Sequence, residues 1–189
     1  MIGIEEFAFL NAIYLKKLAP LEDIGVITGL SGETVERLAG QYVASETVFS
    51  TPSGVMLMPS GTELVLEYYH ETYEALRPQP GLGAWYERFE VINTRFIALI
   101  SEWQRSGGDA TSLGKAIQVV ERLMKAVEDL EPDIPRYESY RRRFAAAIER
   151  VDAGDNEYVS NPTKDSMHNV WFEFHEDILA VLGRPRDTT

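Results

Sequence analysis

Near the start of the chain, apolar residues at helical spacing over residues 7–18 predict a first helix. A shorter pattern predicts a second helix over residues 21–28, and Gly29 suits the left-handed residue that often ends a helix. Ser31 is placed to cap a third helix over residues 32–44, which has one apolar face. Two helices joined by a tight turn are typical of a helix-turn-helix.

The segment that follows has the pattern of a small β-hairpin. Short strands are predicted over residues 47–49 and 55–58, with a turn at residues 51–54 between them. Another helix is expected to begin directly afterwards, because Ser60 and Glu63 stand at capping-box spacing.

In this order of elements, residues 4–76 resemble the winged helix-turn-helix regulators of the MarR-like kind. In those proteins a two-stranded wing ends in a phrase like Leu57-Met58-Pro59-Ser60-Gly61. The resemblance implies a winged-helix fold, DNA binding, and pairing into a homodimer through helices that flank the module.

The second half of the chain is predicted to be entirely helical. Residues 77–83 contain two prolines and two glycines, which predicts a linker. Beyond it, apolar residues at spacings of three and four mark four amphipathic helices, with Asp165 as the cap of the last. We therefore expect a mainly α protein, with a winged helix-turn-helix domain (residues 1–77) followed by a four-helix bundle-like domain (residues 78–189).

The last of these helices carries a second resemblance. Its phrase over residues 170–179 (VWFEFHEDIL) is similar to one in uncharacterised actinobacterial proteins that pair a winged helix with a helical domain. Some of those proteins resemble accessory parts of phosphoenolpyruvate-utilising systems. This resemblance implies no chemistry for the present chain.

Composition narrows the class of protein. The chain has no cysteine, which excludes disulfides and thiolate metal sites. Glu5 and Glu6 stand where a signal peptide would need positive charge, and no apolar run is long enough to span a bilayer. We expect a soluble cytoplasmic protein.

Net charge opposes the function that the fold suggests. The chain has 18 Lys and Arg against 30 Asp and Glu, a net charge of −12. Nucleic acid and anionic membranes repel such a protein unless its cations gather on one face. Residues 1–80 hold four cations against eleven carboxylates, a net charge of −7, and the turn at residues 51–54 has no cation.

The candidate DNA-reading helix is the third, over residues 32–44. Its exposed polar residues include Thr34, Arg37 and Gln41, of which the last two can contact base edges. Glu33 and Glu36 on the same helix would repel phosphates. The other cations of this region, the candidate phosphate contacts, are Lys16 and Lys17.

A candidate ligand site lies in the second half. Arginines spaced seven apart along one helix form a stripe that suits phosphate or carboxylate ligands, although they can equally pair with nearby glutamates. Aromatic residues on the helix faces can form either a core or a small effector pocket, with Asn93 or Gln104 as its polar group. The candidate ligand-binding residues are Arg136, Tyr140, Arg143, Trp103, Trp171 and His175.

Metal binding and catalysis find little support. His168 and His175 are two helical turns apart, about 10 Å, so one ion cannot bridge them. A site from His175 and a distant carboxylate such as Glu71 is conceivable, but a histidine hydrogen-bonded within the bundle is favoured. No glycine-rich phosphate loop or nucleophile elbow is present. We expect no metal, no cofactor and no enzymatic activity.

Two functions follow. The first is a dimeric transcriptional regulator, with Arg37 and Gln41 on DNA and the helical domain dimerising or sensing an effector. The second is an accessory protein whose acidic winged helix docks onto a protein partner, with an anionic metabolite as a further ligand. A positive patch from Arg37, Lys16 and Lys17 would favour the regulator, and a negative face would favour the accessory protein.

Overall fold

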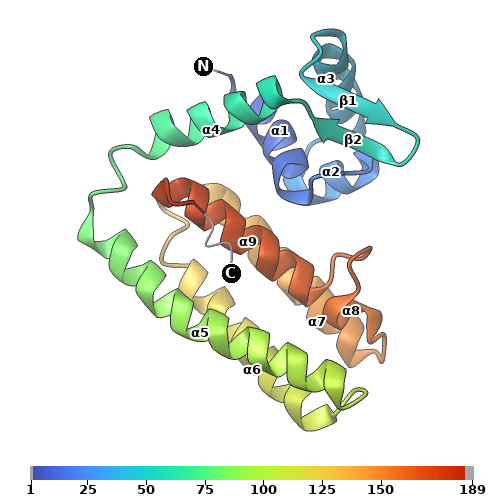
Figure 1. Ribbon diagram of the computed structural model, residues 1–189, viewed down its shortest axis with the longest axis vertical. Helices are drawn as coiled ribbons and strands as arrows, with labels where there is room; N and C mark the ends of the chain where they lie inside the picture. Colours follow the sequence, from blue (N-terminus) through green and yellow to red (C-terminus); the bar gives the residue numbers. More distant parts are fainter. Residues whose placement is uncertain (1, 186–189) are drawn as a thin grey trace. The chain divides into compact units, whose positions relative to one another are not determined.

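The computed structural model describes residues 2–185 and is mainly helical, with one two-stranded antiparallel sheet (Figure 1). It divides into two compact units. Unit 1 comprises Met1–Gln79 and Glu176–Thr189, and unit 2 comprises Pro80–His175. The sequence analysis placed residues 78–189 together, whereas here the chain from Glu176 on is grouped with unit 1.

Three helices begin unit 1, close to where the sequence predicted them. They are α1 (Ile4–Lys16), α2 (Leu21–Thr28) and α3 (Gly32–Ala44). Gly29 has the expected left-handed conformation (φ 75°), and Ser31 Oγ accepts the Thr34 N–H as the cap of α3. α1 ends at Lys16, earlier than predicted, because Lys17 turns the chain with a φ of 67°.

The predicted hairpin is present, with slightly different bounds: β1 is Val48–Thr51 and β2 is Gly54–Leu57. Phe49 pairs with Met56, and Ala19 forms a further antiparallel bridge with Val55. Side chains alternate between the two faces of the strands, so the inner residues Val48 and Val55 are buried.

The predicted cap of α4 and the predicted start of α5 are wrong. α4 (Pro59–Tyr73) has Met58 rather than Ser60 as its N-cap, and Ser60 Oγ donates to the Glu46 carbonyl instead of capping the helix. α5 (Pro80–Arg105) begins inside the predicted linker. The physical reason is shared, because proline has a helical φ and needs no amide partner in the first turn.

The helices of unit 2 are α5, α6 (Ala110–Val127), η1 (Pro135–Tyr137), α7 (Glu138–Asp152), α8 (Glu157–Ser160) and the first part of α9 (Met167–Leu182). The four long helices lie where apolar spacing predicted them, and α6 packs against α5 and α7. Their assembly as a four-helix bundle stays a prediction. The predicted cap Asp165 is wrong, since Ser166 Oγ accepts the Asn169 N–H at the start of α9.

Each unit has its own apolar core. In unit 1 it includes Phe9, Leu38 and Tyr69, and in unit 2 Phe89 and Phe144, all nearly inaccessible to solvent. Within residues 2–185, no helix combines the length and the hydrophobicity needed to cross a membrane.

Gly54 offers a test of the bridge between β2 and the segment after α1. It has a φ of 138°, and a Cβ added there would lie 2.4 Å from the Ala19 carbonyl oxygen. Gly54→Ala should therefore destabilise the protein by about 2–4 kcal/mol in urea unfolding. Gly40→Ala, on an open face of α3, should instead stabilise it by up to about 1 kcal/mol. Equal changes in stability for Gly54→Ala and Gly40→Ala would contradict the close approach of Gly54 to the Ala19 carbonyl.

Candidate functional site

The exposed face of α3 carries the three side chains that the sequence predicted as DNA-reading. Thr34 is half-buried, and its hydroxyl lies 3.0 Å from that of the capping Ser31. Arg37 and Gln41 are exposed and lie one helical turn apart. Their surroundings, rather than their placement, determine what this face can bind.

Glu6 of α1 lies beside this face. One of its carboxylate oxygens accepts a hydrogen bond from Gln41 Nε2 (3.1 Å), and the other accepts the Gly3 N–H (2.8 Å). The Gly3 hydrogen bond, more than the contacts with Gln41 and Tyr42, lowers the pKa of Glu6. Burial and then the Glu6 charge raise the pKa of Tyr42 to about 12. Glu6 is therefore a permanent negative charge next to α3 at neutral pH.

Arg37 is the only Lys or Arg in α3, and it too lies near a carboxylate. Its Nη2 is 3.9 Å from Glu5 Oε2, and both side chains are more than half exposed. Such a pair contributes little to stability because water screens it. It does offset the positive charge that Arg37 would offer to a phosphate.

The predicted cationic partners are not brought to Arg37. Glu5 and Glu6 stand at the start of α1, whereas Lys16 stands at its end, about 16 Å away along the helix axis. Lys17 follows, with its ammonium 4.5 Å from the centre of the Tyr14 ring. A single patch from Arg37, Lys16 and Lys17 therefore does not form.

Unit 2 contains a buried ion cluster around Arg143. Arg143 Nε and Nη2 donate to the two oxygens of Asp165 (2.9 and 2.6 Å), and Nη2 also donates to Glu173 Oε2 (2.6 Å). The Arg143 side chain is only 3% exposed. Burial opposes its charge, but Glu173 and Asp165 outweigh burial and raise its pKa. The guanidinium expected to bind an anion is thus held by carboxylates of the chain itself.

The other two arginines spaced seven apart, Arg136 just before α7 and Arg150 within it, make separate contacts. Arg136 lies over the ring of Tyr137, and Arg150 over that of Tyr158. Tyr140 is buried, with the Arg143 guanidinium 5.5 Å from its ring centre. The spacing of seven residues therefore does not produce one continuous cationic stripe.

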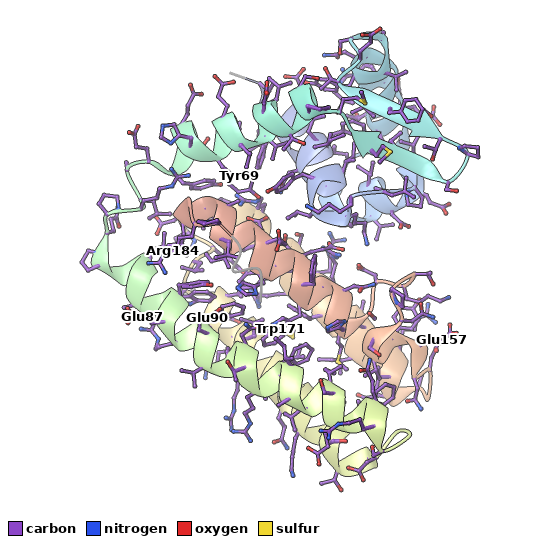
Figure 2. All side chains as sticks on the ribbon, in the orientation of Figure 1. Tyr69, Glu87, Glu90, Glu157, Trp171 and Arg184 are labelled. Atoms are coloured by element: carbon purple, nitrogen blue, oxygen red, sulfur yellow. The ribbon has the colours of Figure 1, made fainter. Side chains whose placement is uncertain are left out.

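The aromatic residues of unit 2 form a core. Trp171 (Figure 2) stacks on Phe96 with ring centres 4.0 Å apart and donates its indole N–H to Asn93 Oδ1 (2.9 Å). Asn93 was predicted as the polar group of an effector pocket, but its side-chain oxygen accepts the Trp171 indole N–H. Trp103 is half-buried, and its indole nitrogen has no hydrogen-bond partner among the residues that the structure describes. Gln104 donates to Ser160 Oγ.

His175 lies in a polar contact at the edge of this core. Its Nε2 is 3.1 Å from the Tyr86 hydroxyl and 3.2 Å from Glu90 Oε1 (Glu90 is labelled in Figure 2). Within unit 2, the carboxylate beside His175 is that of Glu90. Across residues 2–185, no group of three or more histidines and carboxylates is arranged to hold a metal ion.

Sequence reasoning missed two polar residues that organise unit 1. Asn11 accepts a hydrogen bond from the Tyr69 hydroxyl (2.8 Å) and donates to Asp177 (3.4 Å). Arg77 Nε donates to the Val181 carbonyl (2.8 Å), and its Nη2 reaches the Ala180 carbonyl near the end of α9. The available signal was an asparagine inside an otherwise apolar helical pattern, which usually marks a buried hydrogen bond.

Comparisons with protein-family models, curated proteins and solved structures give no match for this chain.

The Arg143 cluster generates a stability prediction. Arg143→Met leaves Glu173 buried without its cation and should cost about 3–5 kcal/mol in urea unfolding. Adding Glu173→Leu removes the stranded charge, so the double variant should be more stable than Arg143→Met alone. Arg141→Ala is the control, since Arg141 pairs with Glu128 and Glu131 nearer the surface and should cost less than about 1 kcal/mol. If the changes in unfolding free energy caused by Arg143→Met and by Glu173→Leu simply add in the double variant, the two residues are not coupled and the prediction is contradicted.

His168 generates a pH prediction. Burial lowers the pKa of His168, so the unfolded chain binds its proton at a higher pH than the folded chain. The corresponding stability is fully present above the ordinary pKa of 6.5 and is lost as pH falls below it. His168→Gln should therefore flatten the decline in stability between neutral and mildly acidic pH. Identical declines in the two proteins would show that His168 does not contribute.

Proposed function

We propose that this chain is a non-enzymatic accessory protein whose unit 1 docks onto a protein partner and does not read DNA. One observation carries the proposal: the exposed face of α3 is bordered by carboxylates, with Gln41 hydrogen-bonded to Glu6 and Arg37 beside Glu5. In this interpretation unit 1 is a degenerate, acidic winged helix.

Electrostatics support this proposal over DNA binding. Affinity for DNA comes largely from Lys and Arg that neutralise phosphates. The net charge of −7 over residues 1–80 works against it, and residues 38–76 contain no Lys or Arg at all. That segment includes both strands of the hairpin, which would be the wing and would have to approach the DNA backbone.

Unit 2 is proposed to act as a supporting helical scaffold. Arg143, Trp171 and His175 all have hydrogen-bonding partners within the unit. An anionic metabolite bound by Arg143 would have to displace two carboxylates, which disfavours that part of the second hypothesis.

The regulator is kept as a second candidate because of the order of elements. α2, a turn at Gly29–Ser31, α3 and the hairpin follow one another as in a winged helix-turn-helix, and Arg37 remains exposed in the middle of α3. For this function the homodimer would have to provide cations that unit 1 lacks.

The two candidates differ in an experiment on DNA. The purified full chain is incubated with a random duplex DNA pool at low and at near-physiological salt, and the retained DNA is sequenced. The docking proposal expects no retention even at low salt, where attraction to phosphate is strongest.

Enrichment of a palindromic motif, lost in Arg37→Ala and kept in Arg150→Ala, would overturn the docking proposal in favour of the dimeric regulator. Arg150 is the matched control because it is an exposed arginine of unit 2. Weak retention of DNA without any enriched motif would also contradict the docking proposal, which expects the acidic protein to repel DNA.

A further inference from the structure

A row of large apolar side chains lies exposed on the outer face of the hairpin. Phe49 and Met56 are directly paired across β1 and β2, so their side chains are neighbours on the same face. The isolated antiparallel bridge between Ala19 and Val55 brings the segment that contains Leu18 beside β2. Met58 lies two residues beyond Met56, on the same face by alternation. The exposed fractions are 42% for Leu18, 55% for Phe49, 40% for Met56 and 38% for Met58.

The fold of unit 1 does not require these four residues, which we call the hairpin row. The inner face of the hairpin already provides the core contacts through Val48 and Val55, which are 2% and 3% exposed. Single exposed apolar side chains are ordinary, but a contiguous row of them marks an interaction surface. The other described large apolar residues with comparable exposure are Ile4, Val26, Val43 and Leu66 in unit 1 and Val91 and Ile97 in unit 2.

The segments that flank the two strands of the hairpin in sequence are acidic. Glu46 precedes β1, and Glu63 and Glu67 follow β2 in α4. The nearest cations along the chain are Lys16 and Lys17, just before Leu18.

We propose that the hairpin row binds an extended segment of a partner protein that carries apolar side chains flanked by Lys or Arg. The apolar side chains pack on Phe49, Met56 and Leu18, and the basic side chains face the carboxylates of unit 1, which outnumber its cations. A second copy of this chain is a poorer occupant, because its unit 1 brings the same negative charge. This inference rests on the proposed docking function and assigns it a surface and a class of partner.

Selection from a phage-displayed library of random peptides tests this, with the full chain as bait. The expected result is enrichment of peptides that combine apolar residues with Lys or Arg, and whose binding weakens with salt. Enriched peptides should bind the Phe49→Ser/Met56→Ser variant about tenfold more weakly or worse. The matched control is Val91→Ser/Ile97→Ser, which changes two similarly exposed apolar residues of unit 2 and should leave binding unchanged.

The outcomes separate this inference from the function on which it rests. Peptides that bind both variants equally, but lose binding in Glu33→Lys/Glu36→Lys on α3, would overturn the hairpin surface and leave the docking function standing. Enrichment of acidic or uncharged peptides would overturn the class of partner. No enrichment at all would overturn the inference, and the DNA experiment would then decide the function separately. Circular dichroism of each variant should show an unchanged fold, because the substituted positions are exposed.

Discussion

The Glu6 carboxylate determines the electrostatic character of the α3 face. It is fixed by hydrogen bonds from the Gly3 amide and from Gln41, and the Gly3 bond lowers its pKa. It therefore keeps a negative charge beside the helix that would have to enter the major groove. The other carboxylates of unit 1 reinforce this charge, and Arg37 alone on α3 opposes it. The interpretation of unit 1 as a docking module depends on this constraint.

The hairpin complements this acidic face. Its inner side chains close the core of unit 1, and its outer side leaves Phe49 and Met56 in solvent. Acidic surroundings and an apolar row together favour a partner that is apolar and basic, which neither DNA nor an anionic membrane provides. In unit 2, Arg143 of α7 pairs with Glu173 of α9 and with Asp165, which lies just before α9. This buried cation therefore serves the fold.

Sequence patterns predicted the helices and the hairpin well, because periodicity, Gly29 and the Ser31 cap are local signals. They failed at the cap of α4, which is Met58 rather than Ser60, and at the start of α5, where the prolines and glycines were interpreted as a linker. The site was harder to predict. Exposed positions on α3 follow from helical spacing, but the contact between Gln41 and Glu6 joins residues 35 apart in sequence. Likewise, the pairing of Arg143 with both Asp165 and Glu173 depends on tertiary packing, and the sequence alone left ion pairing and ligand binding as alternatives.

The most direct test of the central claim is an NMR titration of the isotope-labelled full chain with a short duplex DNA at low salt. Backbone amide signals of Thr34, Arg37 and Gln41 report on the exposed face of α3. If that face is acidic and does not read DNA, these signals should not move as DNA is added. Saturable shifts concentrated on these three residues would contradict the account and identify α3 as a DNA-binding helix.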